Sequence, residues 1–416
     1  MRLVCLSCLI VTATLLGACL GGGKAPAGAG SASAPVVNTT AVTVDTGPAA
    51  ATGAINHAYV SVRVCAPGSA SSCTTIDHVL LDTGSWGLRV IRSVLAAGSV
   101  TLPAETDAQG QTIEECATFG SGQTWGPVAT ADVTIAGETA AKVPVQIMDD
   151  TGTGAAPPGT CGASGTLVNQ VTDWQANGVL GIGVFAQDCG TACVAATTPL
   201  AQYYGCATGG ACAAENVALP AQVTNPATLF TADNNGIIVS VPALQNANGD
   251  ASVQGELIFG LGTQADNGLP PTALTLLGAD ANGDFATTFN GASSSLPALI
   301  DSGTDSYLFD DPGIPVCTSA AWVGFYCPPV APLSLTAVNT SAAATTASVV
   351  GSGDTVTFAV GDPDTFVATA TAFSELAGGG GSTSFTWGMP FFYGRKIYIG
   401  FDGQASGSFK GPFYAY

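Results

Sequence analysis

The sequence predicts a mainly β protein built from two homologous lobes, and three observations lead to this prediction. The chain has 416 residues, more than one ordinary hydrophobic core accommodates. After residue 55, short apolar or alternating runs separated by turn residues predominate, whereas helical candidates such as SVLAAG and PLAQYYG are few and short. One Asp-containing motif occurs in two related copies, so lobes are expected over residues 55–238 and 239–416.

The first 18 residues are predicted to be a lipoprotein signal peptide. Arg2 provides the positive charge, LVCLSCLIVTATLLGA is the apolar stretch, and the segment LLGAC, which ends at Cys19, resembles a bacterial lipobox. Cys19 would carry the lipid, and an ordinary signal peptide cut nearby is the alternative. No later stretch of about 18 apolar residues follows, so the lipid would be the sole membrane contact. We expect a lipid-anchored protein of the bacterial cell envelope, in the outer membrane because Leu20 is not a retention aspartate.

Residues 19–54 are predicted to be the lipidated cysteine and a flexible tether, because Gly, Ala, Ser, Thr and Pro dominate them. Within this tether, VVNTTAVTV could form one strand. From Ile55 onward, strands are predicted at HAYVSVRV, TTIDHVLL, VATADVTIAG, AKVPVQIM, NGIIVSVPAL and GELIFGLG.

The charge of the chain limits its partners. The formal net charge is −20, with only nine Lys and Arg residues, and these do not cluster. Phosphate backbones and anionic membranes bind clustered cations, so neither nucleic acids nor anionic membranes are expected partners.

The cysteines predict disulfide bonds in an exported protein. Of 13 cysteines, three belong to the signal peptide and lipidation site, and an even number remains. The segment CGTAC at 189–193 has near metal-ligand spacing, but the chain has two histidines and an oxidising compartment disfavours zinc thiolates, so no metal or other cofactor is expected. The predicted disulfide cysteines are Cys65, Cys73, Cys116, Cys161, Cys189, Cys193, Cys206, Cys212, Cys317 and Cys327, with Cys65–Cys73, Cys206–Cys212 and Cys317–Cys327 as local pairs.

The repeated motif is VLLDTGSWGLRV at 79–90 and ALIDSGTDSYLF at 298–309. Each copy is followed by an apolar run that reaches a glycine, at Gly181 in NGVLGIG and at Gly388 in FTWGMPFF. This arrangement predicts two homologous units. A third DTG, at Asp45, lacks such a run and precedes Pro48, so we interpret it as a plain turn.

Two such loops brought together about a pseudo-twofold axis would place Asp82 against Asp301. Carboxylates roughly 3 Å apart cannot both ionise easily, so one keeps its proton and the pair titrates as a unit. One carboxylate then acts as base on a shared water while the other acts as acid. The expected supporting residues pack the loops closely or donate hydrogen bonds: Thr83, Gly84, Ser85, Ser302, Gly303 and Thr304.

These motifs resemble those of the pepsin-like aspartic peptidases over almost all of residues 55–416. The resemblance lies in DTGS at 82–85, DSGT at 301–304, NGVLGIG, GELIFGLGTQADNG and FFYGRKIYIGFDGQASGSFKG. It implies two β-barrel-like lobes around a central cleft, peptide-bond hydrolysis by Asp82 and Asp301, and a protein or peptide substrate. A monomer is expected.

The family covers its cleft with a hairpin flap, and FGSGQTWG at 119–126 stands in the corresponding place. Phe119 occupies the usual position of a tyrosine, and Arg89 that of the tryptophan which holds the tyrosine hydroxyl. Trp86 and Trp125 are expected either to cover the cleft instead or to be ordinary core aromatics. The flap tip would comprise Phe119, Gly120, Ser121 and Gly122.

The leading functional hypothesis is therefore an exported, lipid-anchored aspartic endopeptidase. The alternative is a non-catalytic envelope lipoprotein that binds a peptide or glycan in the same cleft, and a third reading is a structural spacer. The paired loops and their hydroxyl residues favour the first hypothesis, and the altered flap favours the second. No G-x-S-x-G motif in a strand–turn–helix context supports a Ser-His-Asp hydrolase.

Overall fold

Strands form most of the regular structure in the computed structural model, which describes residues 37–162, 166–270, 274–348 and 353–416. Alternating sequences become strands with one buried face, as in β19 (Leu333–Thr340), where more buried and less buried positions alternate along LSLTAVNT. The predicted mainly β class is confirmed. The predicted signal peptide, Cys19 and the first part of the tether lie outside the described residues.

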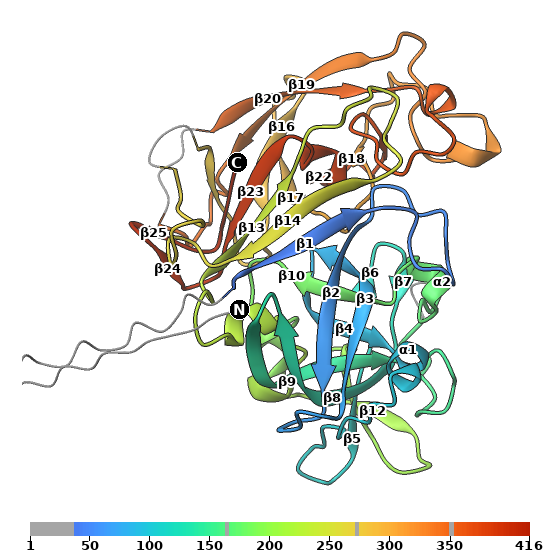
Figure 1. The fold of residues 1–416 in the computed structure, drawn as a ribbon, viewed down its shortest axis with the longest axis vertical. Coiled ribbons are helices and arrows are strands. Elements are labelled where there is room, and N and C mark those ends of the chain that lie inside the picture. Colours follow the sequence, from blue (N-terminus) through green and yellow to red (C-terminus); the bar gives the residue numbers. More distant parts are fainter. Residues whose placement is uncertain (1–36, 163–165, 271–273, 349–352) are drawn as a thin grey trace, which may run out of the picture. The chain divides into compact units, whose positions relative to one another are not determined.

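The larger sheet has 15 strands and extends through both halves of the sequence (Figure 1). Its order is β12 (Cys212–Ala214), β11 (Tyr203–Cys206), β5 (Thr112–Glu115), β8 (Gly126–Ile135), β9 (Glu138–Met148), β4 (Trp86–Ile91), β10 (Gly178–Ile182), β3 (Cys73–Asp82), β2 (Ala58–Cys65), β1 (Thr39–Val44), β14 (Val253–Phe259), β13 (Gly236–Val241), β23 (Arg395–Gly400), β26 (Phe413–Ala415) and β15 (Leu276–Gly278).

The smaller sheet comes entirely from the second half of the sequence. Its order is β20 (Asp354–Val360), β19, β16 (Phe285–Phe289), β17 (Leu296–Ile300), β22 (Phe385–Trp387), β18 (Tyr307–Phe309) and β21 (Ala377–Gly379). Two small hairpins pair β6 (Thr118–Phe119) with β7 (Gly122–Gln123) and β24 (Ala405–Ser406) with β25 (Phe409–Lys410).

Helices are short throughout the described part of the chain. The α-helices are α1 (Arg92–Ala97) and α2 (Val171–Trp174), and the 3-10 turns are Gly190–Cys193, Leu219–Ala221, Pro226–Leu229, Ala320–Trp322, Pro363–Thr365 and Met389–Phe391. None of the described helices is long and apolar enough to cross a membrane.

The repeat in the sequence appears as the same three-strand arrangement in each sheet. In the larger sheet, β10 lies between β3, which is parallel to it, and β4, which is antiparallel, with Gly181 opposite Asp82. In the smaller sheet, β22 lies between the parallel β17 and the antiparallel β18, with Trp387 opposite Ile300. Gly388 therefore corresponds to Gly181, as the sequence comparison predicts.

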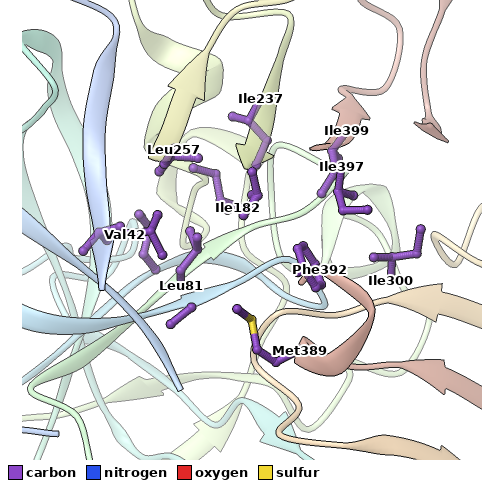
Figure 2. Packing of buried hydrophobic residues seen from close by; sticks show 14 of the residues in the cluster. Val42, Leu81, Ile182, Ile237, Leu257, Ile300, Met389, Phe392, Ile397 and Ile399 are labelled. Atoms are coloured by element: carbon purple, nitrogen blue, oxygen red, sulfur yellow. The ribbon is translucent and has the colours of Figure 1, made fainter. Parts of the chain in front are cut away.

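One hydrophobic core supports both copies of the repeat. Side chains from the two sheets pack into a continuous buried cluster beneath the loops that follow β3 and β17. Figure 2 shows part of this cluster, including Val42, Leu81, Ile182, Ile237, Leu257, Ile300, Met389, Phe392, Ile397 and Ile399. Because dense packing resists displacement, this core fixes the position of one loop relative to the other.

The strand that the sequence allows at VVNTTAVTV, within the predicted tether at 19–54, is present as β1, so this part of the segment is structured and not flexible. Strand β1 pairs with β14 along its whole length and with β2 at its end, so it joins strands of the two predicted lobes. Val42 and Val44 are buried in the core. Short composition-biased segments can still form strands when neighbouring strand edges are free to pair with them. Strand β13 spans residue 238, the predicted join, and pairs on both sides.

Candidate active site

Two loops with the same backbone path bring the predicted acidic residues together. Strand β3 ends at Asp82, and β17 ends at Ile300, directly before Asp301. The three residues before each acid are apolar and mostly buried, at 79–81 and 298–300, and each chain then turns at an Asp-Thr/Ser-Gly sequence. The acidic side chains thus lie at the ends of buried strands.

The hydroxyl residues that follow the aspartates hold the two loops together. Thr83 Oγ1 donates a hydrogen bond to the Ile300 carbonyl (2.8 Å) and accepts one from the Ser302 amide (2.9 Å). Ser302 Oγ donates to the Leu81 carbonyl (2.6 Å) and accepts from the Thr83 amide (3.2 Å). Both hydroxyl side chains are buried, so these reciprocal bonds tie the loops where water cannot compete.

Each carboxyl group receives the same two hydrogen bonds from its own loop. The amides of Gly84 and Gly303 donate to Oδ1 of Asp82 and Asp301, at 2.9 and 2.8 Å. The Ser85 hydroxyl donates to Asp82 Oδ2 at 2.5 Å, and the Thr304 hydroxyl donates to Asp301 Oδ2 at 2.6 Å. These bonds fix the orientation of both carboxyl groups, and both acids line the same cavity.

The glycines of the two loops permit close approach of the acids. A Cβ on Gly84 would lie 2.6 Å from Asp301 Cγ, and one on Gly303 would lie 2.7 Å from Asp82 Oδ1. Burial raises the pKa of Asp82 well above its usual value, and the charge of Asp301 and a hydrogen bond between the two carboxyl groups raise it further. The bonds from Ser85 and Gly84 oppose this shift. The pair therefore favours a shared proton.

A cavity of about 510 Å³ opens above the pair of carboxyl groups. Its lining includes Asp82, Asp301, the first loop and the predicted flap at Phe119 and Gly120. Trp86 and Arg89 also line it, together with Leu200, Ala201 and Gln202 from a later loop. Among the residues that the structure describes, the cavity lining does not include three of the predicted cleft residues, Ser121, Gly122 and Trp125.

The segment predicted to be a flap forms the β6–β7 hairpin, in which Phe119 pairs with Gly122. The hairpin is attached to a neighbouring segment, because the Gln123 carbonyl accepts a hydrogen bond from the Val168 amide (2.8 Å). The Phe119 ring contacts Trp174 edge to face, with the ring centroids 4.9 Å apart. The hairpin therefore reaches the cavity by its tip while its base is fixed.

Trp125 does not cover the cavity, which decides between the two interpretations left open for it. Its side chain is 2% exposed, and its indole Nε1 donates to the Ala155 carbonyl at 2.7 Å. It packs against Tyr204 and the Cys116–Cys161 disulfide in a separate small core. Trp125 is an ordinary core aromatic, whereas Trp86 lines the cavity.

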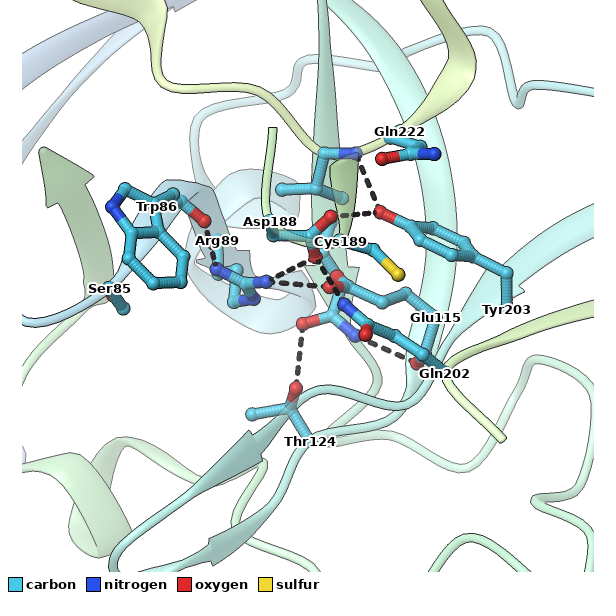
Figure 3. Close-up of polar contacts among 12 residues, drawn as sticks. Ser85, Trp86, Arg89, Glu115, Thr124, Asp188, Cys189, Gln202, Tyr203 and Gln222 are labelled. Atoms are coloured by element: carbon cyan, nitrogen blue, oxygen red, sulfur yellow. Dashed lines mark hydrogen bonds and ion pairs between the residues drawn. The ribbon is translucent and has the colours of Figure 1, made fainter. Parts of the chain in front are cut away.

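A buried ionic cluster beside the acids is the feature that the sequence did not predict (Figure 3). Arg89 Nη2 contacts Glu115 Oε1 at 2.6 Å and Asp188 Oδ2 at 2.9 Å, and Nη1 donates to the Trp86 carbonyl at 2.9 Å. The Tyr203 hydroxyl donates to Asp188 Oδ1 at 2.5 Å. Arg89, Glu115 and Asp188 are each almost fully buried.

Burial raises the pKa of Glu115 well above its usual value, and the nearby charge of Asp188 and a hydrogen bond between the two carboxyl groups add to the shift. Arg89 acts in the opposite direction. A proton on Glu115 would reduce the charge buried around the guanidinium, which lowers the cost of burying the cluster.

All ten predicted cysteines form disulfide bonds. The pairs are Cys65–Cys73, Cys116–Cys161, Cys189–Cys193, Cys206–Cys212 and Cys317–Cys327. Cys189 and Cys193 are thus bonded to one another and do not offer thiolate ligands. Cys327 lies near Asp362 and Asp364, but its sulfur is engaged in the bond to Cys317.

Asp45, in the third DTG, forms the turn that its sequence predicts. Its Oδ1 accepts a hydrogen bond from the Gly47 amide at 2.9 Å, and its Oδ2 lies 3.4 Å from His78 Nε2. It is absent from the described lining of the cavity above Asp82 and Asp301. An identical tripeptide therefore serves two different purposes in this chain.

Comparisons with known proteins give one matching family model and 353 matching chains of solved structures. A family model described as "Protein of unknown function (DUF3443)" matches residues 34–416. No curated protein matches the sequence. The crystal structure of an aspartic proteinase from Irpex lacteus is similar with a TM-score of 0.45 and 14% sequence identity, covering 91% of this chain and 96% of that one.

Proposed function

We propose that this chain, which belongs to the DUF3443 family, is an aspartic peptidase that hydrolyses peptide bonds with Asp82 and Asp301. The observation that supports this proposal most strongly is the carboxyl pair itself. Asp301 lies close enough to raise the pKa of Asp82, each acid receives one amide and one hydroxyl bond, and both line the same cavity. A general acid and a general base at one point are what addition of water to an amide requires.

The chemistry follows from the single shared proton. The ionised carboxylate removes a proton from a water molecule, whose oxygen attacks the peptide carbonyl carbon. The protonated carboxyl group donates its proton to the carbonyl oxygen, giving a neutral tetrahedral intermediate. The first carboxyl group then gives the proton that it took from water to the leaving nitrogen, and the second takes a proton from a hydroxyl of the intermediate. The C–N bond breaks, the carbonyl re-forms, and the pair regains its original protonation. The Ser85 and Thr304 hydroxyls keep the outer oxygens oriented throughout.

The substrate class that fits this site is a protein or peptide in extended conformation. The flap and residues 200–202 line the same cavity as the acids, so a bound chain that passes over the acids would contact both. Export, attachment by lipid at Cys19, residence in the bacterial outer membrane and a monomeric state are part of the same proposal. The LLGAC segment supports export and lipid attachment, the five disulfide bonds support export, and Leu20 after Cys19 supports the outer membrane.

The test is cleavage by the purified chain lacking residues 1–19. Unfolded protein and a peptide library are incubated with it from about pH 3 to about pH 7, with and without a statine-type inhibitor of aspartic peptidases. We expect cleavage that the inhibitor blocks and that Asp82→Asn and Asp301→Asn each abolish. Asp45→Asn is the matched control, because Asp45 has the same DTG context outside the site, and it should retain activity.

Two outcomes would overturn the proposal. Cleavage that survives both Asp82→Asn and Asp301→Asn would place the activity elsewhere. Absence of cleavage together with retained binding of library peptides or glycans would favour the alternative, a non-catalytic binding lipoprotein. The observation that supports this second function is the altered flap, in which Arg89 contacts the Phe119 ring.

A further inference from the structure

Arg89 connects the first active loop to the flap. It lies on β4, directly after that loop, and its Nη1 donates to the Trp86 carbonyl. Its guanidinium carbon lies 5.3 Å from the centroid of the Phe119 ring at the flap tip. A cation over an aromatic face is attractive, and more so where water is excluded. Arg89 is 2% exposed, so the guanidinium side of this contact is shielded from water, and the half-buried Phe119 ring borders the cavity.

The same guanidinium is attached to the base of the flap. Glu115 ends β5, immediately before Cys116, and accepts the 2.6 Å bond from Arg89. Cys116 carries the disulfide to Cys161, and the hairpin begins two residues later. One side chain thus contacts the flap at its tip and at its base.

The third partner of Arg89 comes from a separate part of the chain. Asp188 follows β10 and accepts bonds from Arg89, from the Tyr203 hydroxyl and from Gln202 Nε2 at 3.0 Å. Gln202 lines the cavity. The orientation of Arg89 is therefore fixed from two sides, because Glu115 and Asp188 both accept hydrogen bonds from Nη2 in a buried position where water cannot replace them.

We propose that Arg89 is a positioning residue that holds the flap tip over Asp82 and Asp301 through the Phe119 ring. The inference rests on the proposed peptidase function. A planar, permanently charged guanidinium can contact a ring face and two carboxylates at once, which suits it to this place better than lysine. Phe119 has no hydroxyl, so the flap tip is held by its ring face and edge rather than by a hydrogen bond from the ring.

Two variants separate this role from general support of the fold. Arg89→Met removes the cation but leaves Glu115 and Asp188 without it, so it also lowers stability. Phe119→Leu removes the ring and leaves the ionic cluster intact. The matched control is Arg395→Met, because Arg395 lies 4.3 Å from the Phe391 ring centroid and is absent from the described lining of the cavity.

Hydrogen exchange of the flap amides, residues 118–123, gives a readout that does not depend on catalysis. We expect exchange roughly 5- to 30-fold faster in Phe119→Leu and Arg89→Met, the change that corresponds to loss of a desolvated cation–aromatic contact. The double variant should exchange no faster than the faster single variant, because both changes remove one contact. Arg395→Met should leave flap exchange unchanged.

Activity supplies the second readout. We expect kcat to fall on the order of 10- to 100-fold in Phe119→Leu with a native melting temperature, because the flap would no longer be held over the substrate. Unchanged flap exchange in Phe119→Leu, or strictly additive effects in the double variant, would overturn the inference. The two proposals can fail independently. If the wild-type chain cleaves no peptide, the peptidase proposal fails, but the predicted changes in hydrogen exchange of the flap amides can still be measured in the variants.

Discussion

Replacing Gly84 with alanine tests how closely the two acids must approach. The added Cβ would lie 2.6 Å from Asp301 Cγ and 2.8 Å from each carboxyl oxygen, whereas ordinary contact begins at 3.4 Å. The Asp301 carboxyl would have to move away by roughly 1 Å, a displacement that costs about 100-fold in rate when it affects reacting groups. Gly84→Ala should therefore lower kcat by about 100-fold.

The same substitution should alter stability less severely than activity. Inserting a methyl group into a closely packed position costs about 1–3 kcal/mol, which we expect to see as a lower free energy of unfolding in a denaturant titration. Asp82 should also lose part of its pKa elevation, because the charge of Asp301 and the hydrogen bond between the acids contribute to it. A pH–rate profile would then show the upper limb displaced toward lower pH.

Gly159→Ala is the matched control, since no atom lies within 4 Å of the Cβ it would introduce. It should retain wild-type kcat and stability. The reasoning would be refuted if Gly84→Ala kept more than about half of the wild-type kcat while its free energy of unfolding fell within the expected range. That result would mean that the carboxyl pair tolerates displacement and that close approach is not what the glycine provides.

Three further predictions concern stability. Burial raises the pKa of Glu114 to about 8 and that of Glu215 to about 7, so the folded state binds more protons than the unfolded state. The stability that this proton binding contributes is complete below the ordinary glutamate pKa and is lost as pH rises toward 7–8. Denaturant titrations should therefore show a free energy of unfolding that falls with pH over this range, and Glu114→Gln should reduce that dependence. Removing the Cys116–Cys161 disulfide, which spans a sequence separation of 45, should lower the free energy of unfolding by about 4 kcal/mol by the loop-entropy model, and a loss below about 1 kcal/mol would contradict that account. Thr83→Val keeps the shape of the side chain but removes the hydroxyl that bonds the two loops. It should lower the free energy of unfolding by about 1–3 kcal/mol and should also lower kcat. An unchanged unfolding curve would show that the reciprocal bonds contribute little to stability.

The sequence was sufficient to predict the carboxyl pair because the relevant signals are local and repeated. An aspartate at the end of an apolar strand, a hydroxyl residue and a glycine specify one turn, and a second copy with its own glycine-ended strand specifies the partner. The register of Gly181 opposite Asp82, and the reciprocal bonds of Thr83 and Ser302, agree with that prediction. A single copy would not have been enough, as the turn at Asp45 demonstrates.

The sequence was insufficient where the deciding contact joins distant segments. Nothing local indicates that Glu115 and Asp188 meet at Arg89, because the three residues come from β5, the segment after β10 and β4. The orientation of Trp125, which lies between β7 and β8, was equally undetermined, and the structure selects the core position over the cleft position.

By itself, the sequence determined that this protein is mainly β, that it contains a duplicated Asp-turn unit, and that its cysteines pair. These properties depend on strand periodicity, turn residues and composition, which are readable along the chain. Only the tertiary structure decided that β1 joins the two halves, and that a buried guanidinium lies under the flap where the sequence showed only an unexpected arginine. The physical reason is that a charge can be buried only where other groups pair with it, and here those groups are distant from Arg89 in sequence.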